Sequence, residues 1–333
     1  MLDYPFPRPA HGEPTEVADG VRWLRMPLPF ALDHINLWLL EGDGERVLVD
    51  TGVASDGCRS HWEALLPRWA PTRILVTHFH PDHLGLARWL HSRTGAPVWM
   101  TRHEFAAADR LMGLDDETVG AGIAGFFRLH GLDEERAQRL QRRGNTYRPL
   151  VDGIPEVARF PGENERLALA GGEWRVIIGR GHAPEHACLF RERDAVLISG
   201  DQLLPRISSN VSVPPHAPDA DPLAEFLAAL DRLDELPADT LVLPSHGRPF
   251  RGLHRRTAQL RAHHAEHLEH LGDAARSQPL TAASALPLLF DRELDAHSLF
   301  FAMGEAIAHL NHLWHADVLE RRCRDGVLEF AAP

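Results

Sequence analysis

The segment LVTHFHPDHLG, residues 75–85, places three histidines and an aspartate within six residues. Its first half has the pattern of a strand, in which alternate side chains share a face, so we expect His78 and His80 to point the same way. The turn that follows would bring Asp82 and His83 to a second position beside the first. Imidazole and carboxylate groups are suitable ligands for Zn²⁺ and similar ions. The segment therefore predicts the start of two adjacent metal sites, which need further ligands from elsewhere in the chain.

Candidates for those further ligands follow other short apolar segments. His182 follows VIIGRG, Asp201 follows LISG and His246 follows LVLPS. Asp50 follows VLV in the same manner. A chance cluster among the 22 histidines of the chain would not predict more candidate ligands at matching positions.

The segments that must position these residues are short, rich in Val, Ile and Leu, and closed by glycine or a polar turn. This is the pattern of buried strands that lead into loops. Helical patterns lie between them, at 82–93 and 221–236. The alternation predicts an α/β layered domain. The predicted strand segments are 46–52, 73–80, 174–182, 195–201 and 240–247.

A mainly helical insertion at about 103–150 interrupts the alternation. We interpret it as a helical hairpin packed on the body or as a lid whose apolar face lines a substrate pocket. From residue 252 the pattern is helical until VLERRCRDGVLEF, where Asp325-Gly326 indicates a β-hairpin. Three helices and a hairpin resemble a winged-helix module. We therefore predict a catalytic domain over 1–251 and a small C-terminal winged-helix-like module over 252–333.

Composition narrows the classes of partner and location. The chain has 35 basic residues, all arginine, against 47 acidic ones, and residues 252–333 hold 8 Arg against 11 Asp and Glu, so nucleic acid is disfavoured as a partner. The proline-rich N-terminus lacks the apolar segment of a signal peptide, and no apolar run reaches the roughly 18 residues of a membrane span. Cys58, Cys188 and Cys323 form no disulfide framework. These features favour a cytoplasmic protein that acts on a small molecule.

Taken together, VDTG, THFHPDH, GRGHAPEH, SGD and PSHG resemble the five ordered motifs of the metallo-β-lactamase-fold hydrolases, over residues about 20–250. The resemblance implies an αβ/βα sandwich with two metal ions at one edge of its two sheets. The residues that would hold the first ion are His78, His80 and His182; those that would hold the second are Asp82, His83 and His246; Asp201 would bridge the ions, and Asp50 would orient ligands through hydrogen bonds.

The same resemblance implies a binuclear hydrolase. Two divalent ions would generate a bridging hydroxide, since catalytic zinc lowers the pKa of water from 15.7 to about 7. The hydroxide would attack a carbonyl or phosphorus, and Asp82 or Asp201 could take part in proton transfer. Zinc is the expected metal, and iron or manganese would suit the same ligands.

Departures from known branches of the family bear on the substrate. Asp201 at the fourth motif argues against a primary β-lactamase role, and Leu204 stands where homoserine-lactone lactonases usually have tyrosine. Glutathione thioesterases of this fold usually bind glutathione through lysine and arginine side chains. The absence of lysine removes part of that binding site, although arginine could replace it. His80 stands where diiron oxidoreductases usually have glutamate. We expect a thioester or related acyl substrate; a lactonase, a phosphodiesterase or endoribonuclease, and a non-catalytic metal-binding interaction protein remain alternatives.

Other polar residues carry weaker expectations. Arg206, close to Asp201, is a candidate for binding a substrate carboxylate or phosphate, with a structural ion pair as the alternative. His34 is a candidate for the rim of the site, and His186 is expected to support the third-motif loop. The C-terminal module is interpreted as an interaction surface that packs on the catalytic domain or forms a homodimer. No recognisable carboxylate or cysteine accompanies the remaining histidines, which we interpret as surface or core-edge residues: His263, His267, His309, His312 and His315.

Overall fold

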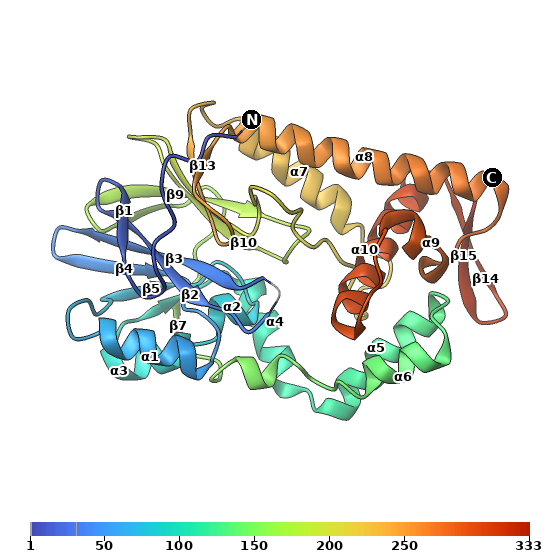
Figure 1. The fold of residues 1–333 in the computed structure, drawn as a ribbon, viewed down its shortest axis with the longest axis horizontal. Coiled ribbons are helices and arrows are strands. Elements are labelled where there is room, and N and C mark those ends of the chain that lie inside the picture. The colour runs from blue at the N-terminus through green and yellow to red at the C-terminus, as the bar shows by residue number, and fades with distance from the viewer. Residues whose placement is uncertain (1, 31) are drawn as a thin grey trace. The chain divides into compact units, whose positions relative to one another are not determined.

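The computed structural model describes residues 2–30 and 32–333 (Figure 1). The described chain forms two compact units. The first comprises residues 1–113, 146–209 and 231–257, and the second comprises 114–145, 210–230 and 258–333. Each unit is thus built from three separate segments of the sequence.

The first unit contains two mixed β-sheets. In the first sheet β1 to β4 pair antiparallel in sequence order, and β4 to β7 continue in parallel. Its strands are β1 (Thr15–Ala18), β2 (Val21–Pro27), β3 (His34–Gly42), β4 (Glu45–Val49), β5 (Arg73–Leu75), β6 (Val98–Trp99) and β7 (Val157–Arg159).

The second sheet has the order β13-β12-β11-β10-β9-β8. Its neighbours pair antiparallel except β11 and β12, which are parallel. Its strands are β8 (Arg166–Leu169), β9 (Gly172–Gly179), β10 (His186–Arg191), β11 (Val196–Gly200), β12 (Leu241–Pro244) and β13 (Phe250–Arg251).

Alternating side chains of both sheets form one apolar core between them. Trp23 and Trp38 of the first sheet stack with ring centroids 6.4 Å apart, and Trp174 of the second sheet belongs to the same buried cluster. A second cluster lies on the other face of the first sheet, where Leu37 and Leu48 pack with Trp62 of α1 (Asp56–Leu65) and Leu90 of α3 (Ala87–Thr94). The first sheet is thus buried on both faces, which explains why its central strands are apolar throughout.

The helices assigned wholly to the first unit are short. Gly85 ends the first turn after the histidine motif, and Leu86 precedes the next helix, so the predicted helix at 82–93 is two helices. These elements are α1 (Asp56–Leu65), α2 (Pro81–Leu84), α3 (Ala87–Thr94), α4 (Arg102–Gly113) and the 3₁₀ turn η1 (Arg148–Leu150).

Two backbone hydrogen bonds tie the sheets together where the polar motifs follow the strands. Ala187 N–H, in β10, donates to the carbonyl of Thr77 at 2.9 Å. Asn36 N–H, in β3, donates to the carbonyl of Ser245 at 2.7 Å. The loops that follow β5 and β12 are therefore anchored to the opposite sheet, which brings the polar residues of the two sheets to one edge.

The second unit is helical apart from one hairpin. Phe127 of α5 and Phe300 of α10 lie with ring centroids 6.0 Å apart, and Leu280 and Phe330 exchange two backbone hydrogen bonds. Its elements are α5 (Asp116–Leu129), α6 (Glu134–Gln141), α9 (Ala282–Leu289), α10 (Ala296–His315), β14 (Glu320–Arg324) and β15 (Val327–Ala331). α7 (Pro222–Asp234) and α8 (Leu253–Ser277) each begin in one unit and end in the other.

Each of the five predicted strand segments contains a strand, and the hairpin at Asp325-Gly326 is present as expected. The strand predicted over 73–80 is shorter than expected: β5 ends at Leu75, so His78 and His80 lie in the loop that follows it and not in extended strand. The predicted insertion is shared between units: α4 belongs to the first, whereas α5 and α6 belong to the second. The contiguous division at residue 252, the lid and the winged-helix likeness stay predictions. None of the helices in the described part of the chain is long and apolar enough to span a membrane.

Candidate metal centre

The structure gathers the seven residues predicted as metal ligands at one edge of the first unit. They form two groups, in each of which the ligand atoms lie within 4.8 Å of one another. The first group follows β5, β9 and β11, and the second follows β5 and β12. The first group is His78, His80, His182 and Asp201, and the second is Asp82, His83 and His246.

The first group is built around the ring of His78, which is fully buried. His78 Nε2 lies 2.9 Å from Nδ1 of His80 and 3.3 Å from Nε2 of His182. Thr77 Oγ1 lies 3.1 Å from the other nitrogen of His78, Nδ1, and so orients the ring. Three imidazole nitrogens thus converge on one small volume.

Asp201 presents a different oxygen to each group. Its Oδ2 lies 3.5 Å from Nε2 of His182, in the first group. Its Oδ1 lies 3.6 Å from Nε2 of His83 and 3.4 Å from Nε2 of His246, in the second. Asp82 Oδ2 completes the second group, 3.3 Å from Nε2 of His246. A carboxylate in this position is suited to bridging two cations.

Two observations show that these residues fit metal ions. His83 Nε2 and Asp201 Oδ1 are buried and have no hydrogen-bond partner in the structure. Buried polar atoms are rarely left unpaired, because each such atom costs about 1–3 kcal/mol. The donor set of imidazoles and carboxylates is also the one that Zn²⁺, Fe²⁺ and Mn²⁺ accept.

The pKa values of the histidines differ between the two groups. Burial, reinforced by the neighbouring ring of His182, lowers the pKa of His80 to about 3, so the ring of His80 in the first group is neutral at neutral pH. Burial also opposes the charged form of His246, but Asp201 and Asp82 outweigh it and raise its pKa to about 10. Metal ligands must be deprotonated, so a cation bound in the second group would release protons.

Asp50 fixes the orientation of His83. Asp50 Oδ2 accepts a hydrogen bond from Nδ1 of His83 at 2.8 Å, and Asp50 Oδ1 accepts from the backbone N–H of Thr77, also at 2.8 Å. All three side chains are fully buried. Nε2 of His83 is thereby directed at the carboxylates of the second group. Asp50 itself adopts a left-handed backbone conformation (φ 62°), which few non-glycine residues adopt and which aspartate tolerates better than most.

His34 and Asn36 of β3 hold the loop that carries His246. His246 Nδ1 donates to the backbone carbonyl of His34 at 2.8 Å, which leaves Nε2 for the site. The ring of His34 is buried, with Nε2 3.0 Å from the N–H of Gly247 and Nδ1 2.6 Å from Asp33. Its predicted contact with substrate stays a prediction. The amide of Asn36 donates to the carbonyls of Pro244 and Gly247, a role that the sequence analysis missed.

His186 supports Asp201 directly. Its Nε2 accepts a hydrogen bond from the backbone N–H of Asp201 at 3.0 Å, and its ring lies 4.8 Å from that of His78. Gly200 makes this approach possible, because a Cβ there would collide with the His186 ring and because its φ is 53°. His186 was expected to support the loop after β9; the contact with the residue after β11 had no signal in the sequence.

Glu104 is a second residue that sequence reasoning missed. It is fully buried in α4 and accepts hydrogen bonds from the backbone N–H groups of Phe79, at 2.9 Å, and Glu185, at 2.6 Å. One carboxylate therefore joins the loops that carry His80 and His182. Burial raises the pKa of Glu104 to about 7.

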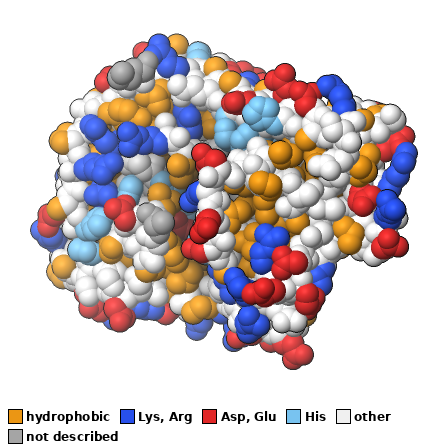
Figure 2. Space-filling model, turned by 45° about the vertical axis from the view of Figure 1, so that its right-hand side comes forward, with side chains coloured by type: hydrophobic (Ala, Val, Ile, Leu, Met, Phe, Trp, Pro, Cys, Tyr) orange, Lys and Arg blue, Asp and Glu red, His pale blue; other side chains and the backbone are white. Residues whose placement is uncertain are grey.

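Arg206 is exposed, five positions after Asp201, and its predicted contact with substrate stays a prediction. The face drawn in Figure 2 carries arginine and acidic side chains side by side.

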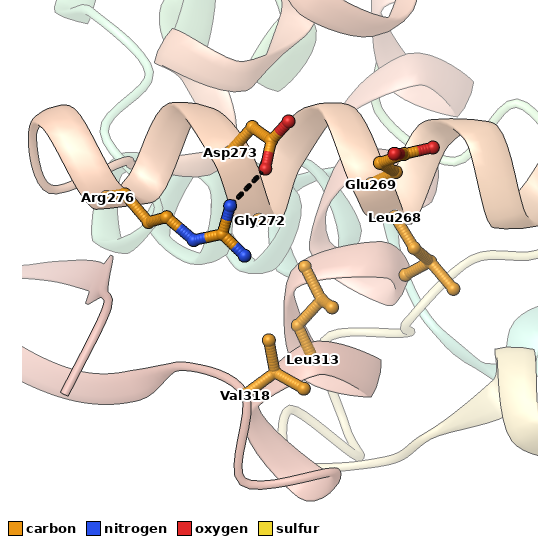
Figure 3. Close-up of a pocket in the computed structure, with 7 residues that line it drawn as sticks. All are labelled: Leu268, Glu269, Gly272, Asp273, Arg276, Leu313 and Val318. Carbon is orange, nitrogen blue, oxygen red and sulfur yellow. Dashed lines mark hydrogen bonds and ion pairs between the residues drawn. The ribbon is translucent and has the colours of Figure 1, made fainter.

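A cavity of about 290 Å³ includes Arg180 and Glu185, from the loop that carries His182. A larger one, about 490 Å³, lies in the second unit, where Leu313 and Val318 lie opposite the part of α8 that carries Leu268 and the ion pair of Asp273 and Arg276 (Figure 3). The larger cavity contains no residue of either metal-ligand group.

Comparisons with known proteins agree with this geometry. A sequence model of the metallo-beta-lactamase superfamily matches residues 31–246, and one of the metallo-beta-lactamase-like C-terminal domain matches residues 268–333. The crystal structure of a beta-lactamase domain protein from Burkholderia ambifaria is 46% identical, with a TM-score of 0.92 over 100% of this chain and 98% of that one.

Two curated relatives are also similar to the chain. A probable metallo-hydrolase from Bacillus subtilis is 27% identical over 307 residues, 87% of this chain and 91% of the relative. A hydroxyacylglutathione hydrolase from Xylella fastidiosa is 35% identical over 126 residues, which cover 38% of this chain and 43% of the relative. The second similarity is thus confined to part of each protein.

Proposed function

The chain belongs to the metallo-beta-lactamase superfamily, and on that premise we propose that it hydrolyses an acyl thioester with two divalent metal ions. The membership confirms the predicted family, the α/β sandwich fold and the metal-dependent hydrolase. A hydrolase of this kind acts on a small-molecule substrate. The bond that is hydrolysed, the identity of the metal ions and the roles of single residues are what we propose.

The observation that carries the proposal is the position of Asp201 between the two ligand groups. Its two oxygens lie 3.5 Å from His182 Nε2 and 3.4 Å from His246 Nε2. We assign His78, His80 and His182 to one ion and Asp82, His83 and His246 to the other, with Asp201 shared. When bound, such a pair of ions supplies a hydroxide nucleophile near neutral pH and polarises a carbonyl oxygen.

Zinc is the metal that we propose, because imidazole-rich sets with one or two carboxylates are typical of catalytic zinc. The chain's own residues would prepare the site. Asp50 and the carbonyl of His34 hold a proton of His83 and of His246 on Nδ1, so that Nε2 is the nitrogen of each ring that would release its proton and bind an ion. Asp82 is the more exposed carboxylate of the centre, with 18% of its side chain accessible against 10% for Asp201, and is our candidate for accepting a proton during turnover.

Support for a thioester comes from the local similarity to hydroxyacylglutathione hydrolase, whose named substrate is a thioester. A thioester carbonyl is a good electrophile, and its thiolate departs without needing a strong general acid. Arg206 is exposed and close in sequence to Asp201, so it could bind an anionic group of the acyl or thiol portion.

The proposal is tested by a hydrolysis panel on purified, zinc-loaded protein. The panel contains acyl thioesters, lactones, phosphodiesters, RNA and a β-lactam. We expect turnover of thioesters, its loss in His80→Ala, and its retention in His61→Ala, which removes a histidine outside both ligand groups. Turnover of lactones or phosphodiesters alone would replace the thioester with that bond, and activity that survives in His80→Ala would contradict the metal mechanism.

Two further assignments are also proposals. We place the protein in the cytoplasm, which the three free cysteines support, since Cys58 and Cys188 are buried and unpaired and Cys323 is exposed. We also propose that the C-terminal module serves as an interaction surface, with a homodimer as its simplest form. Gel filtration with light scattering would test the second assignment.

A further inference from the structure

A third group of metal-type ligands lies in the second unit, on α8 and α10. His263 and His267 are one helical turn apart on α8, with ring centroids 4.2 Å apart. Glu305 of α10 lies beside them, and each of the three offers a ligand atom within 4.8 Å of the others. The sequence interpretation of these histidines as residues without an accompanying carboxylate is therefore corrected, because α10 supplies one.

One buried nitrogen atom of this group is left without a hydrogen bond. Nδ1 of His267 is buried and meets no hydrogen-bond partner in the described structure. The neighbouring ring of His309 is already engaged, since its Nδ1 donates to the carbonyl of Glu305 at 2.8 Å and its Nε2 lies 3.1 Å from Nδ1 of His264. Histidines that merely pack in a helix interface would be expected to satisfy their buried nitrogens within the protein. A cation would satisfy Nδ1 of His267 here.

The carboxylate of Glu305 points to the same conclusion. Burial raises the pKa of Glu305 to about 7, and burial is the one cause of the shift. A buried carboxylate is costly unless it is paired or coordinates a metal. Burial also lowers the pKa of His267 to about 4, so its ring is neutral and able to act as a ligand at neutral pH. The group thus combines two imidazoles with an acid that lacks a cationic partner of its own in the described structure.

We propose that His263, His267 and Glu305 bind a divalent transition metal ion, with Zn²⁺ as the ion that suits them best. Two histidines four residues apart on a helix, together with a glutamate from another element, form a set known from zinc sites. The segment HHAEH also has the order His-x-x-Glu-His found in one class of zinc enzymes, with Glu266 exposed between the two ligands. The ion would join α8 to α10 and leave a fourth position for water.

This site is independent of the binuclear centre, so the two can be tested separately. The first measurement is the number of Zn²⁺ ions retained per chain after loading and extensive dialysis, by elemental analysis of the full-length protein. We expect three for the wild type, and two for His267→Ala and for Glu305→Gln, with hydrolytic activity retained in both variants. His270→Ala and Glu269→Gln remove exposed residues of the same helix and should still retain three.

The second measurement follows the third site by spectroscopy, in variants whose folding is checked by circular dichroism. His80→Ala removes a ligand of the proposed catalytic centre, and this protein is titrated with Co²⁺ while its visible absorption is followed. We expect the Co²⁺ spectrum of His80→Ala to keep a low-coordinate component that is lost when Glu305→Gln is added and is kept when Glu269→Gln is added instead, whereas an ion held by Asp82, His83 and His246 would contribute equally to all three proteins. Two ions per wild-type chain, or three ions in wild type and variants alike, would overturn the third site. Loss of hydrolysis with three ions bound would instead count against the proposed function alone.

Discussion

Asp50 Oδ2 lies 2.8 Å from Nδ1 of His83, and neither side chain is exposed to solvent. The carboxylate therefore dictates which nitrogen of His83 carries the proton. Because Nδ1–H donates to Asp50, Nε2 is the nitrogen of the neutral ring that carries the lone pair, and it is directed toward Asp82 and Asp201. A residue that binds no metal itself thus decides whether a ligand of the second ion is in the right tautomer.

Replacing Asp50 with asparagine tests this relationship. The amide nitrogen of Asn would donate to Nδ1 of His83 and so place the ring proton on Nε2, the nitrogen that should bind the ion. We expect the affinity for one of the two catalytic ions, and the activity, to fall by about 10–100-fold. Zinc titration of the metal-free protein measures the change. Asp152→Asn, which alters a surface ion pair with Arg59, serves as the control and should leave both quantities unchanged. Equal affinities in the Asp50 variant and the wild type would refute the role of Asp50.

Gly200→Ala tests the close approach of His186 to the residue that bridges the two groups. A Cβ at Gly200 would strain the backbone at φ 53° and collide with the His186 ring, which accepts the N–H of Asp201. We expect a loss of unfolding free energy of about 2–4 kcal/mol, together with weaker zinc binding. Both are measured by denaturant unfolding and metal titration.

Gly44→Ala separates backbone strain from the collision. Gly44 also has positive φ, 77°, but nothing lies within 4 Å of its added Cβ. The unfolding free energy of the Gly44→Ala protein should therefore fall by about 1–2 kcal/mol from strain alone, and its zinc affinity should not change. If the two glycine variants behave alike, the contact between Gly200 and His186 has no special importance for the site.

The raised pKa of Glu104 predicts how the stability of the protein depends on pH. Burial raises its pKa from 4.5 to about 7 in the folded protein, against the effect of the N–H groups of Glu185 and Phe79. The folded state therefore holds this proton to higher pH than the unfolded state does. The stability contributed by neutral Glu104 is fully present below about pH 4.5 and is lost as the pH rises through about 7.

The variant Glu104→Gln cannot ionise and should lose that dependence. Between about pH 4.5 and pH 8, the unfolding free energy of wild type relative to Glu104→Gln should decrease by about 3 kcal/mol. Urea unfolding of both proteins across this range measures the difference, which is insensitive to any constant cost of the substitution. Glu63→Gln, at an exposed position, should run parallel to the wild type. A difference between wild type and Glu104→Gln that does not vary with pH would show that Glu104 ionises normally.

The strands and the seven gathered residues could be predicted from the sequence because their signals are local. A short apolar segment that ends in His78-x-His80 contains both the element and the residues that it positions. Because the strand ends meet at one edge, candidates after β9, β11 and β12 could be brought together without knowledge of the contacts. The prediction of one helix over 82–93 was less accurate, because Gly85 ends α2 and a second helix starts after Leu86.

The residues that support the site could not be predicted in the same way. Asn36 donates to the carbonyl of Pro244, more than 200 positions away, and nothing in its neighbourhood marks that contact. Glu104 belongs to a segment with a helical pattern, where a glutamate is expected to face solvent, yet it is buried against the backbone of two loops. Glu305 is likewise brought to His263 and His267 by the packing of two helices that are distant in sequence. Such roles depend on tertiary contacts that periodicity does not encode.

The central claim is tested most directly by thioester hydrolysis before and after the metal is removed. The wild-type protein is stripped with a chelator, assayed, reloaded with zinc and assayed again, beside Asp201→Asn treated identically. We predict that stripping abolishes turnover, that zinc restores it, and that the reloaded variant is slower by at least about 100-fold. Undiminished thioester hydrolysis by the stripped protein, or equal rates for the reloaded wild type and Asp201→Asn, would contradict a binuclear centre bridged by Asp201.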